Sequence, residues 1–235
     1  MKRIGILGGS SDQATADYYR RLNRAVNERQ GGWNTAELVI SSMNFALAER
    51  WVRQGDWTAA GEYLAGRARA LEAAGAELLL CVSNTLHRVA ERFTQGLAIP
   101  FLHIVDPTAA AIRAAGLTRV ALLGTKPVMA TDFLKRRYQE RFGVEVLVPA
   151  PAEQHEVDRV IFDELCRGRF LPASKARYLA ICDALAAAGA EGVILGCTEI
   201  PLLLAQADRP GLPMFDTTAL HVAAAVEQAL APGAG

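Results

Sequence analysis

The hydrophobic positions of the chain fall into short apolar runs separated by longer stretches with helical spacing. Two of the longer stretches, at 57–74 and 174–188, are rich in Ala, Leu and Arg at helical intervals. Short continuous apolar runs are typical of strands buried on both faces of a parallel sheet. They predict strands at 3–7, 36–42, 77–82, 100–105, 119–123, 144–148, 192–195 and 213–215. This alternation predicts an α/β fold with parallel sheets and crossover helices.

The chain also contains an internal repeat. Ala73-Ala74-Gly75-Ala76-Glu77 recurs 114 residues later, ending at Glu191. Residues 3–8 are echoed at 119–124, and Ile99-Pro100 is echoed by Leu212-Pro213, at offsets of 116 and 113 residues. Three matches in order indicate two copies of one α/β unit. We therefore expect two pseudo-symmetric lobes, residues 1–98 with 209–235 and residues 99–208.

Composition narrows the classes of partner and compartment. The 235 residues carry 25 basic and 25 acidic side chains, so net charge favours neither nucleic acid nor an anionic membrane as partner. No apolar run reaches the roughly 18 residues that span a bilayer, and the first residues do not resemble a secretory signal. The four cysteines show no CxxC spacing, which suits a reducing compartment. We expect a cytoplasmic protein.

The repeat places two reactive side chains at equivalent positions. Ser83 follows Glu77 by six residues, and Cys197 follows Glu191 by six. Each lies just beyond an apolar strand, where open parallel sheets place their ligands. Polar neighbours follow each of them: Asn84-Thr85 and Thr198-Glu199. If the two units face each other, a hydroxyl and a thiol approach one cleft from opposite sides.

Such a pair suits proton transfer at a stereocentre, which needs one group on each face of the carbon. A cysteine has an unperturbed pKa of about 8.5, which falls at a helix N-terminus, and Cys197 is expected to lie at one. A serine can relay a proton but is a poor unaided base. The alternatives are that Cys197 is a buried apolar residue and that Ser83 only caps a helix. Cys81, Cys166 and Cys182 are expected to be structural.

Two further loops end strands of the repeat, Gly8-Gly9-Ser10-Ser11 and Gly124-Thr125. Backbone N–H groups at such ends bind carboxylates. The first loop lacks the GxGxxG spacing of a dinucleotide site. The four histidines lack metal-site spacing, and there is no GxSxG elbow of an α/β-hydrolase. No nucleotide, metal or other cofactor is predicted.

With these residues in view, the sequence closely resembles the aspartate/glutamate racemase family of cofactor-independent amino-acid racemases. Two pieces are specific, Asn84-Thr85 and Gly196-Cys197-Thr198-Glu199, because in the family each accompanies a catalytic cysteine. Further matches span nearly the whole chain: Ile4 to Gly9, Ala14-Thr15, Tyr18-Tyr19, His87, Pro100 to Ile104, Leu122 to Thr125, Ile200 and Phe215 to Thr217.

The resemblance implies two flavodoxin-like three-layer lobes with parallel four-stranded sheets, an active site between them and a homodimer. It implies that Cys197 is the base for an L-amino acid, opposite Ser83. It also implies that the α-carboxylate is held by Asn84, Thr85, Thr125 and Thr198. The expected substrate-binding set is completed by Ser10, Ser11, Arg50, His155, Glu156 and Glu199.

The sequence departs from the family pattern at three places. Ser83 replaces the first-lobe cysteine, although family members that prefer the L-enantiomer can carry threonine there. Ser10 replaces a methionine. Gln154-His155-Glu156 stands before the 160–165 helix, where members acting on acidic substrates often carry a lysine. Glu156 would repel an acidic side chain unless Arg50 compensates. The substrate is therefore expected to be a small L-amino acid, with aspartate and glutamate the default of the family.

Two other functions stay open on the sequence. Relatives with a single cysteine in the second lobe protonate the carbanion left by decarboxylation of a malonate-type acid, which needs only one acid. Loss of the first thiol could also leave an inactive amino-acid-binding homologue. The retained Asn84-Thr85 favours a racemase.

Overall fold

The computed structural model describes residues 1–232 as two compact units, each built on its own parallel sheet. Unit 1 comprises residues 1–104 and the chain from His221 onward, and unit 2 comprises Val105–Leu220. Both boundaries lie later in the chain than the expected 98/99 and 208/209. The prediction of two similar α/β units otherwise matches the architecture.

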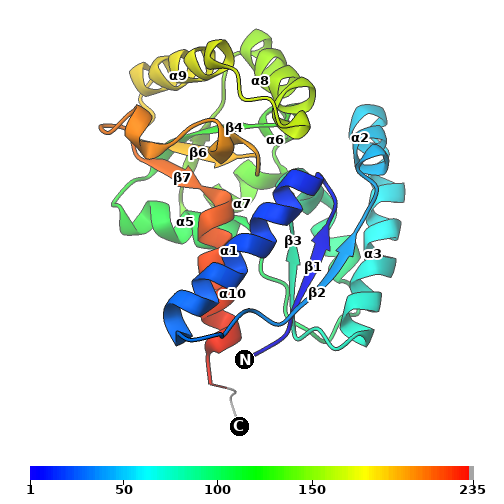
Figure 1. Ribbon diagram of the computed structural model, residues 1–235. Helices are drawn as coiled ribbons and strands as arrows, with labels where there is room; N and C mark the ends of the chain where they lie inside the picture. Colours follow the sequence, from blue (N-terminus) through cyan, green and yellow to red (C-terminus); the bar gives the residue numbers. More distant parts are fainter. Residues whose placement is uncertain (233–235) are drawn as a thin grey trace. The chain divides into compact units, whose positions relative to one another are not determined.

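Unit 1 is a three-layer arrangement around a three-stranded sheet of order β2-β1-β3. Ile4, Ile6 and Leu80 pack under the helices of one face, and Leu7, Leu79 and Cys81 under those of the other. Figure 1 shows α1 and α10 on one side of this sheet and α3 on the other. Its elements are β1 (Ile4–Gly8), α1 (Asp12–Gln30), β2 (Leu38–Ser42), α2 (Phe45–Gln54), α3 (Trp57–Ala73), β3 (Leu78–Cys81), the 3₁₀ helix η1 (Thr85–Val89), α4 (Ala90–Thr94) and most of α10 (Thr217–Leu230).

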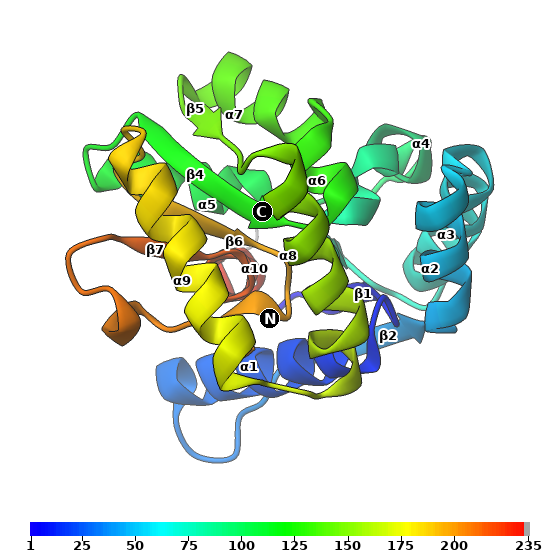
Figure 2. The same cartoon turned by 90° about the horizontal axis from the view of Figure 1, so that it is seen from above.

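Unit 2 repeats this plan around a four-stranded sheet of order β5-β4-β6-β7. One face packs against α8 and α9 and the other against α5 and α7. Figure 2 shows α8 and α9 crossing over β4 and β6. The elements are α5 (Val105–Ala114), β4 (Arg119–Gly124), α6 (Lys126–Ala130), α7 (Phe133–Phe142), β5 (Glu145–Leu147), α8 (Pro151–Asp163), η2 (Leu165–Arg167), α9 (Pro172–Ala187), β6 (Val193–Gly196), η3 (Ile200–Leu202), η4 (Gln206–Asp208) and β7 (Met214–Asp216).

The internal repeat extends to individual hydrogen bonds. The Glu77 carboxylate accepts from the backbone N–H of Arg3 at 2.8 Å, and the Glu191 carboxylate accepts from that of Arg119 at 2.9 Å. These two contacts, which we call the carboxylate latches, tie the start of β3 to β1 and the start of β6 to β4. The latches support the two-copy interpretation of the sequence.

The strand expected at 100–105 is reduced to a single bridge between Leu79 and Phe101. This bridge is equivalent to the Val193–Met214 pair that begins the β6–β7 ladder. Beyond it, the Leu102 carbonyl and the Ile104 N–H bond to His221 and His87 rather than to a neighbouring strand. The unit 1 sheet therefore has three strands instead of the expected four.

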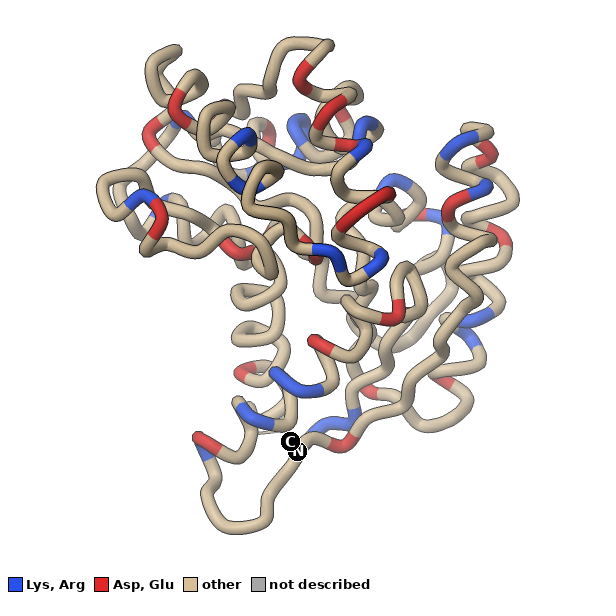
Figure 3. The backbone as a smooth tube through the Cα atoms, turned by 45° about the horizontal axis from the view of Figure 1, so that its top comes forward, with Lys and Arg blue, Asp and Glu red and all other residues tan. Residues whose placement is uncertain are grey.

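Acidic and basic residues are interspersed along both units (Figure 3). Within residues 1–232, no helix combines the length and the apolar character needed to cross a membrane.

Candidate functional site

In unit 1, the predicted polar residues gather where two neighbouring strands end. Leu7 of β1 lies beside Cys81 of β3, so the loops that follow these strands are adjacent. The Ser10 hydroxyl donates to the Val82 carbonyl at 2.6 Å and joins the two loops. The first loop requires glycine at position 9, because φ of Gly9 is +83° and a Cβ there would lie 2.1 Å from the Met43 carbonyl oxygen.

Ser83 lies in the second of these loops and is 8% exposed. Its hydroxyl oxygen accepts a hydrogen bond from the Leu86 backbone N–H at 3.2 Å. This is the capping contact that the sequence offered as the alternative role of Ser83. A hydroxyl that accepts one bond still has a proton to donate, so capping is compatible with a role in proton relay. Asn84 and Thr85 follow it and are also buried.

Two further residues of the predicted substrate-binding set belong to unit 1. Ser11 is fully buried, and its hydroxyl oxygen caps α1 by accepting from the Ala14 N–H at 3.1 Å. Arg50 lies on α2 with its side chain exposed. Ser11 therefore has a local structural role, whereas Arg50 stays a predicted ligand.

The equivalent loops of unit 2 hold the second group of predicted residues. Gly124 at the end of β4 pairs with Gly196 at the end of β6, so the loops beyond them are adjacent. Thr125 follows the first strand and Cys197 follows the second. Cys197, Thr198 and Glu199 are all buried, Glu199 to 1% exposure. Each unit thus places its candidate proton-transfer residue, Ser83 or Cys197, beyond the carboxyl ends of two adjacent parallel strands.

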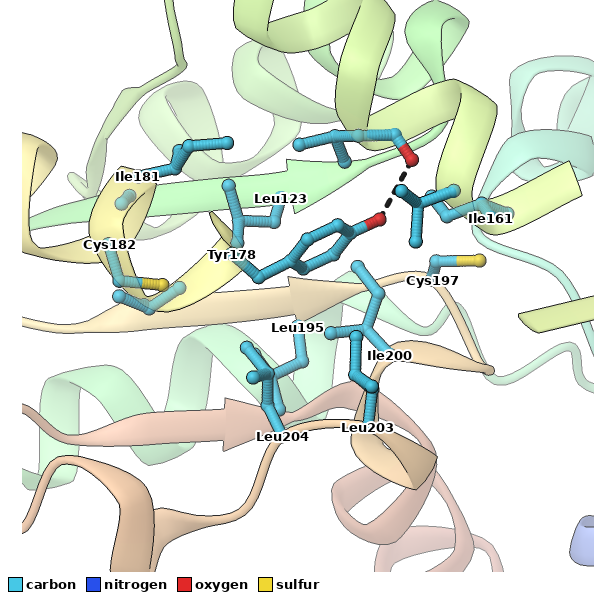
Figure 4. Packing of buried hydrophobic residues seen from close by; sticks show 14 of the residues in the cluster. Leu123, Ile161, Tyr178, Ile181, Cys182, Leu195, Cys197, Ile200, Leu203 and Leu204 are labelled. Atoms are coloured by element: carbon cyan, nitrogen blue, oxygen red, sulfur yellow. Dashed lines mark hydrogen bonds between the residues drawn. The ribbon is translucent and has the colours of Figure 1, made fainter. Parts of the chain in front are cut away.

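The Cys197 thiol is bonded to a carboxylate. Its Sγ donates to Glu199 Oε2 at 3.0 Å, and the Thr198 hydroxyl donates to the same oxygen at 2.9 Å. Figure 4 shows the Cys197 side chain at the margin of the core cluster that contains Tyr178 and Ile200, with its sulfur directed away from Leu195. The thiol is therefore held by a buried anion.

This environment corrects one expectation. Burial and the negative charge of Glu199 raise the pKa of the Cys197 thiol well above its ordinary value. The sequence predicted a helix N-terminus that would lower it. Only the three-residue 3₁₀ helix Ile200–Leu202 follows, with Glu199 at its start. In the structure Cys197 is accordingly a protonated thiol near neutral pH.

The residues expected before a helix, Gln154-His155-Glu156, lie inside α8, because Pro151 begins that helix. The Glu156 carboxylate accepts from Arg177 Nε at 2.7 Å, which offsets its charge. His155 Nε2 lies 3.3 Å from the Lys126 ammonium nitrogen. Repulsion of an acidic substrate by Glu156 is therefore weaker than the sequence implied.

Lys126 and Arg177 were not predicted as site residues. Lys126 directly follows Thr125, and its backbone N–H donates to the buried Asp158 carboxylate at 2.7 Å. In the sequence, the signal that pointed to Lys126 was its position directly after Thr125, a predicted ligand. Arg177 pairs with α8 from α9, a contact between distant segments that no local pattern indicates.

Comparison with known proteins agrees with this arrangement. The family model of Asp/Glu/hydantoin racemases matches residues 4–225. The chain is similar to a candidate Asp/Glu racemase from Yersinia pestis, with 38% identity, 98% of this chain and 100% of that chain covered, and a TM-score of 0.90. It is also similar to an aspartate racemase homologue from Pyrococcus horikoshii, with 36% identity, 97% and 99% coverage, and a TM-score of 0.83.

A more distant structure, the aspartate racemase of Picrophilus torridus, shares the fold at 17% identity, with 97% and 94% coverage and a TM-score of 0.80. The family match covers nearly the whole chain, including the loops that carry Ser83 and Cys197. This protein therefore belongs to the Asp/Glu/hydantoin racemase family.

Proposed function

We propose that this protein is an isomerase, a cofactor-independent amino-acid racemase in which Cys197 and Ser83 serve opposite faces of the substrate α-carbon. One observation carries the proposal. The thiol and the hydroxyl occupy equivalent places in the two copies of the fold, each within two residues of the end of the strand that pairs with the first strand of its unit. Buried polar residues follow both of them, as a site for a charged small molecule requires.

In the L-to-D direction, Cys197 first loses its proton to the Glu199 carboxylate, to which it is already hydrogen-bonded. The resulting thiolate takes the α-proton, and the electron pair of the broken Cα–H bond stays on the substrate. The Ser83 hydroxyl then delivers a proton to the opposite face and is reprotonated from solvent, while Glu199 returns the proton it took from Cys197 to solvent. Because an alcohol is a much weaker acid than a thiol, proton transfer at Ser83 is slower than proton transfer at Cys197.

For the substrate, we propose an acidic L-amino acid, aspartate or glutamate. Glu156 is paired with Arg177, so it opposes a second carboxylate less strongly. Lys126 lies at the carboxyl end of β4 with its ammonium group beside His155, and it offers a positive charge to a distal carboxylate. Arg50 is a second candidate for that role.

A single observation favours a second function. The raised pKa of Cys197 keeps its thiol protonated, which suits delivery of a proton to a carbanion. A decarboxylase of malonate-type acids needs this step alone, whereas a racemase must also form the thiolate. The retained polar pair Asn84 and Thr85 beside Ser83 favours the racemase.

One experiment separates these functions. The protein is incubated in deuterated water with each enantiomer of aspartate, glutamate and alanine, and loss of the α-proton signal is followed by NMR. Parallel samples with malonate acids are assayed for CO₂. Deuterium at the α-carbon supports the racemase, CO₂ without exchange supports the decarboxylase, and neither product with retained ligand binding identifies an inactive binding homologue.

A further inference from the structure

Three of the four histidines form one buried cluster in unit 1. His87, His103 and His221 are exposed to 3%, 9% and 0%. The ring centroid of His87 lies 4.5 Å from that of His103 and 6.3 Å from that of His221. Buried imidazoles need hydrogen-bond partners, and those partners reveal which ring nitrogen carries the proton.

The His87 ring is fixed in one neutral form. The Ile104 backbone N–H donates to its Nε2 at 3.1 Å, so that nitrogen bears a lone pair and no proton. Its Nδ1 lies 2.6 Å from the Ser83 carbonyl oxygen, which can only accept. His87 therefore carries its proton on Nδ1, and adding a second proton would break the bond to Ile104.

His221 has the opposite arrangement. Its Nε2 lies 2.9 Å from the Leu102 carbonyl oxygen and must donate to it. In the neutral ring, Nδ1 accepts from the Tyr18 hydroxyl at 2.9 Å. The two imidazoles thus hold the short segment Leu102–Ile104, one by its carbonyl and the other by its N–H.

This segment has a special place in the chain. Ile104 is the last residue of unit 1 before the chain enters unit 2, and His221 is the first residue after the chain returns. His87 joins this crossing to the loop of Ser83, which lies four residues before it. Both nitrogens of His87 are bonded to the backbone, so the ring does not present a metal ligand.

We propose that His87 is a positioning residue, which holds the Ser83 loop against the Leu102–Ile104 crossing through its Nδ1–H tautomer. Movement of the crossing displaces Ser83, and the bond to the Ser83 carbonyl keeps the hydroxyl in the orientation in which its oxygen accepts from the Leu86 N–H. The inference rests on the proposed role of Ser83 but makes predictions that need no activity.

Two measurements test this positioning role, which we call the His87 clamp: the tautomer of His87 and the hydrogen bonds made by the Ile104 and Leu86 amides. Nitrogen NMR of the histidine-labelled protein should show His87 protonated at Nδ1 and not at Nε2. Asn places its amide near the Nδ1 position and Gln near the Nε2 position. His87→Asn should therefore speed hydrogen exchange of the Ile104 amide, whereas His87→Gln should spare Ile104 and speed exchange of the Leu86 amide.

Kinetics then test the link to Ser83. His87→Gln should lower kcat for α-proton exchange from the D-enantiomer by about 10- to 100-fold, as expected for a displaced catalytic group, with KM little changed. His87→Asn should keep most of this rate. Tyr18→Phe removes the hydroxyl partner of His221 and serves as the control, with an unchanged D-side rate.

Protonation of His87 at Nε2, or equal effects of the Asn and Gln variants on the Leu86 amide, overturns the proposal. If the wild-type protein exchanges no α-proton at all, the proposed function fails, and the NMR measurements still decide the clamp.

Discussion

The Cys197 thiol donates a hydrogen bond to the Glu199 carboxylate, with 3.0 Å between Sγ and Oε2. Both side chains are buried. Burial raises the thiol pKa, and the negative carboxylate raises it further because it opposes formation of a second anion on sulfur. The reactivity of Cys197 thus depends on its burial and on a neighbour two residues away.

Replacement of Glu199 by Gln should lower the pKa of Cys197, because the opposing charge is removed. The pH dependence of Cys197 alkylation by iodoacetamide measures this. The alkylation profile should move to lower pH. Glu191→Gln removes a carboxylate of the same unit that contacts Arg119 instead, so its profile should match the wild type. An unmoved Glu199→Gln profile contradicts the assignment.

The two proposed catalytic positions, Ser83 and Cys197, should behave asymmetrically. Cys197→Ala should abolish α-proton exchange from the L-enantiomer, while Ser83→Ala should impair full inversion and spare L-side exchange. Ser83→Cys should raise the D-side rate, because a thiolate forms far more readily near neutral pH than an alkoxide. NMR exchange rates for each enantiomer check this.

The control for Ser83 is Ser83→Thr, which keeps both the hydroxyl and the oxygen that caps Leu86. Its rates should stay within a small factor of the wild type. If Ser83→Cys leaves the D-side rate unchanged while the L-side rate stays intact, Ser83 is not the position opposite Cys197.

Removal of the Lys126 charge should act on acidic substrates alone. Lys126→Met should raise KM for L-aspartate or L-glutamate about tenfold, the loss expected for one charged hydrogen bond, and leave L-alanine little changed. Lys135→Met is the matched control, since that lysine lies on α7, away from Lys126 on α6, and pairs with Asp132 three residues before it. Equal effects of Lys126→Met on all substrates would place the distal carboxylate elsewhere.

Alkaline solution should destabilise the protein through Cys81. Burial raises the pKa of this thiol to about 12. The unfolded state therefore loses the Cys81 proton at lower pH than the folded state does. Above pH 9.0, the ordinary value, the free energy of unfolding should fall with rising pH. One such group contributes at most about 1.4 kcal/mol per pH unit.

Cys81→Ala isolates this effect. Near neutral pH the variant should be less stable than the wild type, because a small cavity replaces the buried thiol. At about pH 10 the difference should shrink by roughly 1 kcal/mol, because ionisation of Cys81 in the unfolded state lowers the stability of the wild type but not that of the variant. Urea denaturation at both pH values measures it, and a constant difference contradicts the prediction.

The periodic pattern and the repeat located most strands to within one or two residues, because burial on both faces leaves a continuous apolar run. The 100–105 segment was the exception. Its apolar residues read as a strand, yet two histidines from distant parts of unit 1 take the backbone groups that a strand neighbour would use. Such contacts leave no local trace in the sequence.

The site divides in the same way. Ser83 and Cys197 could be located from the repeat, because equivalent residues of the two copies take equivalent places in the two units. The pKa of Cys197 could not, since it depends on how the Glu199 side chain turns back toward the thiol. The pairing of Glu156 with Arg177 likewise depends on two helices whose contact the sequence does not encode locally.

The carboxylate latches at Glu77 and Glu191 bear on how the two halves of this chain diverged. Each latch lies at the amino end of its strand, while Ser83 and Cys197 lie beyond the carboxyl ends. A change of residue at the reactive end leaves the latch intact. A duplicated ancestor with identical halves could thus exchange one proton-transfer residue while both halves kept folding, and an alcohol in one copy with a thiol in the other is the pattern that such separate inheritance produces.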